Sequence, residues 1–232
     1  MWCFCMHKIS DAEILVNGTS YHCAASAACT DALWFSVHAP QLGGMLRVET
    51  FRNMFSPDAV CASAMLYAQR KQVTHPTVVT VECGDLPNLF SVVVNPAREQ
   101  ATCVLPVPRV EELEPNLMLL RYPTVTCLVQ VSELQSPLPT EVDAELAVIC
   151  SPDHAQATAW NRTAHGGWEA AQSNGLAAAS AAIVFARSFA DGVTEHDVQM
   201  PGGTAEVGVS IRNGELTGLS VCSSVKIVLD EE

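Results

Sequence analysis

The stretch that decides the fold is Gly166-Gly167-Trp168-Glu169-Ala170-Ala171-Gln172-Ser173-Asn174-Gly175-Leu176-Ala177-Ala178-Ala179. A turn that contains glycine and serine leads here into a helix of very small residues, which we expect over about residues 173–189. Because the first N–H groups of a helix have no partner inside it, they point outward and attract an anion. The small side chains indicate that sheets wrap the helix closely. The sequence therefore predicts a buried helix whose start has the build of a substrate-binding site.

The composition is that of an acidic globular protein. The chain has 232 residues, 49% of them hydrophobic, and a formal net charge of −13. Only 12 residues are Lys or Arg and they form no long run, so direct binding of nucleic-acid phosphates is not expected. The acidic balance favours a basic partner instead. We expect no membrane span, no secretory signal and no transit peptide.

The cysteines are scattered through apolar stretches rather than arranged as a disulfide framework, although there are 10 of them. We expect them to be small buried hydrophobic residues in a reducing compartment. Cys3 and Cys5 lack a second pair at zinc spacing, so the sequence predicts no metal site, and it predicts no cofactor. The expected location is intracellular, in the cytoplasm or an organelle matrix, the mitochondrion included, and not the secretory pathway.

One structural plan recurs in the two halves of the chain. In the first half, Ser56-Pro57-Asp58 opens a helix that runs to about Arg70, with serine at the cap, proline at the first position and an acid in the first turn. Segments with strand character surround this helix, among them residues 12–16, 46–51, 77–81 and 89–94. Residues 95–115 hold four prolines and several acids, which indicates a crossing between the halves. Further strands then surround the Ala-rich helix in the same way.

We therefore predict an α+β fold of two pseudo-symmetric halves, each a mostly antiparallel β-roll or barrel around a central helix. The first half covers residues 1–105, with its helix at about 57–70, and is joined by the C-terminal strand at about 219–230. The second half covers residues 106–218, with its helix at about 173–189.

Four further motifs lie in a fixed order around these two helices. They are Met6-His7-Lys8-Ile9-Ser10-Asp11, the segment from Phe51 to Cys61, Trp160-Asn161-Arg162, and Pro201-Gly202-Gly203-Thr204-Ala205-Glu206-Val207. Together with the opening stretch, this order resembles diaminopimelate epimerase, of the diaminopimelate epimerase and proline racemase fold superfamily. The resemblance spans about residues 6–230 and implies the same fold of two halves.

The resemblance also implies a chemistry, which is racemisation at an α-carbon without a cofactor. In that family one cysteine removes a proton from one face of the substrate while a second cysteine delivers a proton to the other. Each cysteine lies at a helix N-terminus, where the dipole lowers its pKa. Cys61 matches the first of these cysteines. The alternative interpretation is that Cys61 is one more buried cysteine without a catalytic role. Gln172 stands at the second position, and an amide neither gives nor takes a proton at neutral pH.

The positions that match the family's substrate-binding residues are also changed. The remnants of a ligand site are Asp11, Arg52, Tyr122, Arg162, Ser173 and Asn174. Asp11, Arg52 and Tyr122 each stand where the family has asparagine, and the carboxylate of Asp11 would repel a carboxylate substrate. Arg162 alone is retained from the family's Glu-Arg pair. The fold-bearing positions are thus kept while the chemistry-bearing positions differ, as we expect of a degenerate epimerase, that is, a pseudoenzyme.

Two functions follow from this pattern. The first is a catalytically inactive epimerase-fold protein that serves as a structural, scaffolding or assembly subunit of a larger complex. Its partners would be other proteins, those of a large ribonucleoprotein assembly included. The second is a cofactor-independent isomerase or racemase with an altered substrate, or a binder of small carboxylates, that uses Cys61.

Overall fold

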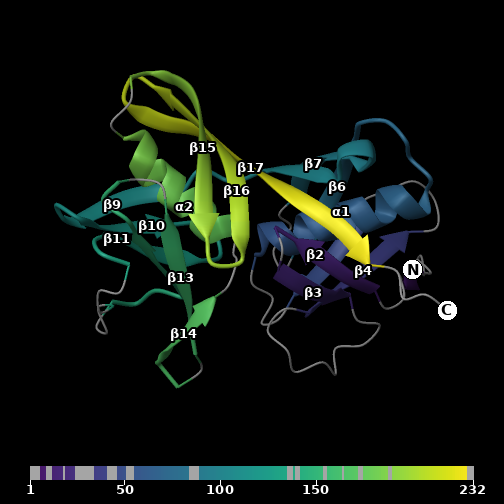
Figure 1. Ribbon diagram of the computed structural model, residues 1–232, viewed down its shortest axis with the longest axis horizontal. Helices are drawn as coiled ribbons and strands as arrows, with labels where there is room; N and C mark the ends of the chain where they lie inside the picture. The colour runs from purple at the N-terminus through teal and green to yellow at the C-terminus, as the bar shows by residue number, and fades with distance from the viewer. Residues whose placement is uncertain are drawn as a thin grey trace, which may run out of the picture. The chain divides into compact units, whose positions relative to one another are not determined.

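The chain divides into two compact units, shown by the computed structural model in Figure 1. Unit 1 comprises Met1–Val104 and Cys222–Glu232, and unit 2 comprises Leu105–Val221. The residues that the structure describes are 6–8, 12–17, 19–23, 34–40, 46–50, 55–83, 89–134, 138, 142–153, 156–163, 165–171, 175–187 and 190–228. Each unit holds a helix among strands, so the predicted α+β fold of two sheet-and-helix halves is confirmed.

Helix α1, Pro57–Arg70, begins where the sequence predicts. Ser56 is its N-cap, and the Ser56 hydroxyl accepts a hydrogen bond from the N–H of Ala59 at 3.2 Å. From Pro57 to Leu66 every side chain of the helix is buried. A helix that is buried on all sides needs strands around it, and α1 contacts β5, β6, β7 and β8.

The strands of unit 1 form a sheet whose two ends are joined. They are β1 (Met6–Lys8), β2 (Ala12–Val16), β3 (Thr19–Cys23), β4 (Trp34–Pro40), β5 (Leu46–Thr50), β6 (Thr77–Cys83), β7 (Leu89–Asn95), β8 (Gln100–Val104) and the end of β17 (Glu215–Val228). The order of pairing is β17, β2, β3, β4, β5, β6, β7, β8, and β1 pairs with β4. Only β3–β4 and β5–β6 are parallel. Because β17 also pairs with β8, this sheet closes on itself.

Asn17 fastens β17 to the turn that follows β2. It has a left-handed backbone with φ of 48°. Its N–H donates to the carbonyl of Ser224 at 2.9 Å, and its side-chain oxygen accepts from the N–H of Ser224 at 2.9 Å. Its side-chain amide donates to the hydroxyl of Ser223 at 3.4 Å. These bonds link residues more than 200 positions apart in the sequence.

Replacing Asn17 by alanine is expected to lower the free energy of unfolding by about 1–3 kcal/mol more than replacing Asn213 by alanine. Asn213 is the matched control because it has nearly the same φ, 54°, in an exposed turn. Both changes strain the left-handed backbone, but only Asn17→Ala leaves the N–H of Ser224 without its acceptor. Urea denaturation of both variants measures the difference. Equal losses would show that the Asn17 side chain contributes nothing.

Unit 2 surrounds helix α2, Gly175–Ala186, with two sets of strands. The first is a sheet of order β14, β13, β12, β11, β10, β9, in which only β11–β12 is parallel. Its strands are β9 (Arg109–Glu114), β10 (Leu117–Arg121), β11 (Thr126–Val131), β12 (Leu146–Cys150), β13 (Ala157–Arg162) and β14 (Trp168–Ala171). The second set is β15 (Gly192–Met200) and β16 (Gly203–Arg212) with the start of β17. Helix α2 contacts both sets, as Figure 1 shows.

Every residue of α2 is buried, which explains its alanines, because larger side chains would hold the two sets of strands apart. The helix ends at Ala186, earlier than the predicted end near residue 189, and its predicted start at residue 173 lies outside the described residues. In the part of the chain that the structure describes, no helix is both long and apolar enough to cross a membrane.

Residues 95–115 are more regular than the sequence suggests. They contain the 3₁₀ turn Pro96–Arg98, strand β8 and strand β9, and the division between the units falls at Val104 and Leu105. Prolines 106 and 108 lie between the two strands and the other two prolines lie outside strands. The prolines therefore mark the ends of strands here, as expected of a residue without an N–H, and not an irregular linker.

Candidate functional site

Three of the candidate site residues belong to the described part of the chain. Cys61 lies in unit 1, and Tyr122 and Arg162 lie in unit 2. The residues that fall outside the described part are Asp11, Arg52, Gln172, Ser173 and Asn174. The described candidate residues therefore lie at the start of α1 and at one end of the sheet in unit 2.

The start of α1 is occupied by the chain's own groups. Pro57 has no N–H, and Ser56 accepts the N–H of Ala59 with its hydroxyl and that of Val60 with its carbonyl, at 3.2 and 3.0 Å. Asp58 adds a carboxylate that is only 1% exposed. An acid in the first turn complements the positive end of the helix dipole. A ligand carboxylate at this helix start would meet a like charge and few free N–H groups.

Cys61 lies one turn inside α1 and is 0% exposed. Its Sγ donates to the carbonyl of Ala101 in β8 at 3.6 Å. A hydrogen bond with the thiol of Cys103, burial, and the nearby carboxylate of Asp58 all raise the pKa of Cys61 well above its ordinary value. A catalytic thiolate needs the opposite, a lowered pKa and access to substrate. Cys61 thus has the surroundings of a core residue.

Iodoacetamide at pH 8 is expected to leave Cys61 unmodified in the folded protein. Because its thiol is protonated and inaccessible, it should react at least about 100-fold more slowly than free cysteine, the factor that corresponds to roughly 3 kcal/mol of local opening. Mass spectrometry of the peptide that contains Cys61 follows the reaction, with the urea-unfolded protein as reference. Labelling as fast as free cysteine would restore the catalytic reading of this thiol.

Tyr122 points into the core of unit 2. It is 6% exposed, and its hydroxyl lies 3.0 Å from that of Ser180 in α2, while the Ser180 hydroxyl donates to the carbonyl of Leu176 at 2.8 Å. Burial raises the pKa of Tyr122 far above its ordinary range. The neutral phenol therefore ties the end of β10 to α2.

Arg162, the last residue of β13, lies against the indole of Trp168. Its guanidinium carbon is 4.7 Å from the ring centroid, and the two residues are paired across β13 and β14. Its N–H donates to the carbonyl of Glu145 at 2.8 Å. Trp168 in turn packs against a buried cluster formed by Leu119, Leu128, Ala144 and Ala147. Arg162 thus covers an aromatic ring through a cation–π contact.

Tyr122 and Arg162 lie at the same end of the sheet but serve opposite faces. The N–H of Glu145 donates to the carbonyl of Thr126, and Thr126 is paired with Arg121, so one row of contacts joins this end of the sheet. Tyr122 contacts α2, as does the face that carries Cys127, since the Ser180 hydroxyl is close enough to lower the pKa of the Cys127 thiol. Trp168 packs on the other face, with Leu128, the neighbour of Cys127. The structure does not bring these two side chains into one pocket.

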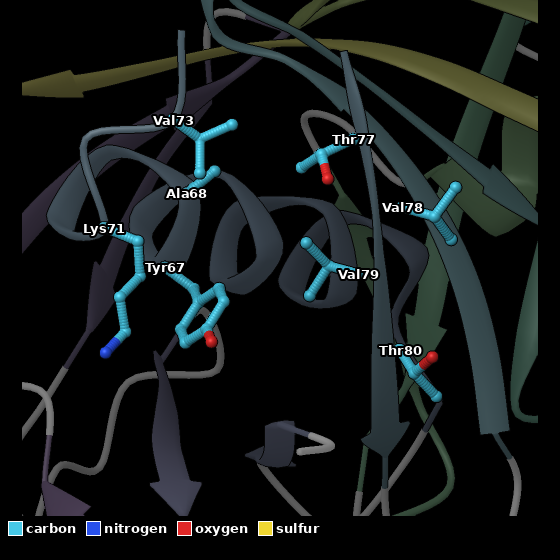
Figure 2. Close-up of a pocket in the computed structure, with 8 residues that line it drawn as sticks. All are labelled: Tyr67, Ala68, Lys71, Val73, Thr77, Val78, Val79 and Thr80. Carbon is cyan, nitrogen blue, oxygen red and sulfur yellow. The ribbon is translucent and has the colours of Figure 1, made fainter. Parts of the chain in front are cut away.

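A cavity of about 680 Å³ in unit 1 lies at the C-terminal end of α1. Figure 2 shows Tyr67 and Lys71 side by side on the helix, opposite the strand residues Thr77–Thr80. The ammonium of Lys71 is 5.8 Å from the centroid of the Tyr67 ring. The C-terminal end of a helix carries partial negative charge, so this is not the anion-binding end of α1. In unit 2, a cavity of about 920 Å³ likewise lies beside Ile183 and Arg187, at the C-terminal end of α2.

The protein groups that engage these residues could not be found from the sequence. The carbonyl of Ala101 is 40 residues from Cys61, and Ser180 is 58 residues from Tyr122. The place of Asp58 in the first turn of a helix could be predicted, since an acid after a Ser-Pro pair is typical of a helix start. Its burial could not, because that depends on strands far away in the sequence. A pattern of neighbours along the chain contains no information on such contacts.

The fold of the chain, two halves of strands each with a helix, matches that of diaminopimelate epimerase-like structures. No family model matches the chain, and no curated protein matches its sequence. Among solved structures it is similar to a phenazine biosynthesis protein of the PhzF family from Bacillus anthracis, at 11% identity and a TM-score of 0.69 over 97% of this chain and 98% of that one.

Two further structures show the same fold. A protein described as a predicted epimerase from Pseudomonas aeruginosa matches with a TM-score of 0.66 at 11% identity, over 94% of this chain and 96% of that one. A probable proline racemase from Agrobacterium radiobacter with bound carbonate matches with a TM-score of 0.62 at 11% identity, over 95% and 92% of the two chains. Identities this low establish the fold and not the activity.

Proposed function

We propose that this chain is a catalytically inactive protein of the epimerase fold that serves as a structural or assembly subunit of a larger complex. Its partners are basic proteins, those of a ribonucleoprotein assembly included, in a reducing intracellular compartment. The acidic charge of −13 supports a basic partner, and the free thiols of Cys61, Cys83, Cys103, Cys127, Cys150 and Cys222 support the compartment.

The observation that carries this proposal is the state of the first helix start. The thiol at the position of the first catalytic cysteine is buried and has a raised pKa, and the turn before it is filled by Ser56, Pro57 and Asp58. A two-base racemisation needs a thiolate that reaches the substrate and helix N–H groups that bind its carboxylate. The glutamine at position 172 removes the second base as well.

The absence of catalysis is tested by exchange of α-hydrogens in deuterium oxide. We expect no deuterium at Cα above the rate without protein, for a panel of amino acids, proline, hydroxyproline and diaminopimelate, measured by mass spectrometry. Incorporation into any of them that is abolished in Cys61→Ala would overturn the proposal. That result would assign the alternative function, an isomerase with an altered substrate.

The role in a complex is tested by size on native gels and gel filtration of cell extract. We expect the tagged chain to migrate with a mass far above its own 24.8 kDa and to keep the same partners after a second purification step. Migration as a lone monomer at its own mass would count against a structural or assembly role, whatever the exchange experiment shows.

A further inference from the structure

Strand β9 ends the six-stranded sheet of unit 2 with an open edge. It pairs with β10 on one side and is the last strand of that sheet in the part of the chain that the structure describes. The cavity of about 920 Å³ lies beside it, so the described residues leave space along this strand. Such an edge presents N–H and C=O groups that can pair with another extended chain.

A β-bulge in β9 brings two charged residues onto one face of the sheet. Arg109 is paired with Arg121 of β10. Glu114 is paired with Leu117, which lies four residues from Arg121 along the same strand. Residues an even number apart in a regular strand share a face, so Arg109 and Glu114 share one as well. They are five positions apart, and only the extra residue at the register shift, Leu113, puts them on the same side.

These two exposed side chains carry opposite charges and have no ion-pair partner among the described residues. Glu111, which lies between them, does have one, since its carboxylate is 3.3 Å from the guanidinium of Arg121. Strand β9 thus carries an unpaired positive charge at its start, Arg109, and an unpaired negative charge at its end, Glu114.

We propose that the β9 edge pairs with the β9 edge of a second copy of the chain, so that the two sheets of unit 2 join in a symmetric dimer. The strands run antiparallel about a two-fold axis beside Glu111. Arg109 of one copy then lies opposite Glu114 of the other, and the symmetry repeats this pair on the far side of the axis. The extra residue of the bulge makes the two positions equidistant from the axis.

The charges of the strand select a second copy rather than another kind of segment. A basic segment would satisfy Glu114 but meet Arg109 with a like charge, and an acidic segment would do the reverse. A second β9 supplies an acid and a base at the two positions that need them. At the axis the two Glu111 carboxylates face each other, but each is already paired with its own Arg121. The two arginines and two glutamates of this row cancel, so the net charge of −13 lies elsewhere on the chain.

The rest of the strand is compatible with this pairing. On its other face, Val110 lines the cavity and Glu112 forms an ion pair with Arg187, so no unpaired charge of β9 remains there. Leu113 is 41% exposed and lies within the stretch that the second strand covers. Burial of apolar surface therefore accompanies the pairing of the two backbones.

The test is the mass of the purified full chain in solution, measured by analytical ultracentrifugation over a range of concentrations. About 0.15 M salt screens charges that are more than about 8 Å apart. We expect a reversible dimer with a dissociation constant between about 1 μM and about 1 mM, since one pair of strands makes a small interface. A chain that is monomeric even at about 1 mM would overturn the proposal.

Charge exchange distinguishes this pairing from any other contact between copies. Arg109→Glu and Glu114→Arg should each weaken the dimer at least about tenfold, because each places like charges opposite each other on both sides of the axis. A mixture of the two variants should dimerise as the wild type does, since every pair across the axis then has opposite signs again. The double variant should regain the dimer for the same reason. No recovery in either case would overturn the proposal.

Matched controls carry the same charge changes away from this edge. They are Arg98→Glu in unit 1 and Glu169→Arg in β14, both at exposed positions. Both should dimerise as the wild type does, and circular dichroism checks that all variants fold. If net charge alone governed association, Glu114→Arg and Glu169→Arg would both associate more tightly than the wild type. That result, or equal weakening in the controls, would contradict the pairing of β9.

Hydrogen exchange locates the interface. We expect the amides of β9 to be protected at high protein concentration and to lose this protection on dilution. A dimer without such protection would assign another interface and overturn the proposal.

The dimer goes beyond the proposed function and does not depend on it, because the purified chain forms it alone. If the chain migrates in a large complex but is monomeric when pure, the pairing of β9 is wrong and the assembly role stands. If the pure chain dimerises through β9 but migrates in extract at no more than twice its own mass, the assembly role is wrong and the pairing stands.

Discussion

Raising the pH from 8 to 11 is expected to unfold the protein. Four buried thiols, those of Cys61, Cys83, Cys127 and Cys150, hold their protons more tightly in the folded chain than a free thiol does. Burial raises the pKa of Cys83 from 9.0 to about 11 and that of Cys127 to about 12. Burial also raises the pKa of Cys150, and the neighbouring Cys103 thiol and burial raise that of Cys61. Burial in these apolar surroundings disfavours the ionised thiolate.

The sign follows from where the protons are bound. Above about pH 9 the unfolded chain releases the thiol protons, whereas the folded chain keeps them until the pH passes 11 to 12. The folded state then binds more protons than the unfolded state, so the free energy of unfolding falls as the pH rises. Over this pH range each buried thiol lowers the free energy of unfolding by roughly 1–1.5 kcal/mol per pH unit. Four of them would use up an ordinary stability of about 5–15 kcal/mol within two to three units.

Urea titrations at pH 7, 8, 9, 10 and 11 measure this loss. The midpoint should be constant between pH 7 and 8 and should fall steeply from pH 9. Cys127→Ala should start less stable but show a shallower fall, because one titrating group is gone. Tyr122→Phe should keep the full slope between pH 9 and 10, which separates the thiols from the tyrosine. A midpoint that is the same at pH 8 and 10 would contradict the buried state of the thiols.

The parts of the fold that could be predicted from the sequence are those with local causes. Ser56, Pro57 and Asp58 mark a helix start because cap, fixed φ and dipole act within one turn. Asn213 and Gly214 mark a hairpin because both adopt positive φ, 54° and 75°. The alanines of α2 indicate tight burial whatever surrounds them. Such signals need no knowledge of distant segments.

The parts that escaped prediction depend on long-range pairing. The sequence did not predict strand β9, because an edge strand carries charges and flanking prolines that are also typical of a linker. The surroundings of Cys61 depend on β8, which lies beside α1 only after the sheet of unit 1 has closed. The order and spacing of the motifs allowed the candidate site residues to be matched to those of the epimerase family. Whether such a side chain faces a ligand or the core depends on the closure of the sheet, which the sequence does not reveal. Tyr122 and Arg162 illustrate the same limit, since both are engaged by side chains of unit 2.

The core of unit 2 contains Phe185, the largest fully buried side chain among the described residues. Replacing it by alanine is expected to lower the free energy of unfolding by about 3–5 kcal/mol. Phe185 is 2% exposed, lies in the last turn of α2 and has its ring centroid 6.3 Å from that of His196 in β15. Its neighbours on the helix include Ala181, Ala182 and Ala186, which are too small to move into the space that the ring leaves. The space left by the ring would therefore remain an open cavity. The free-energy cost of this cavity adds to that of the lost apolar burial.

Hydrogen exchange read by mass spectrometry locates the damage. Because each unit has its own buried helix, Phe185→Ala should increase exchange in α2 and the strands around it, while the amides of α1 keep most of their protection. Phe185→Leu, which keeps most of the volume, should cost less than about 1.5 kcal/mol. Val193→Ala, at an exposed position of β15, should change stability by less than about 0.5 kcal/mol. Equal loss of protection in both units would show that the two cores unfold as one, and a cost near that of Val193→Ala would mean that the space around α2 can close.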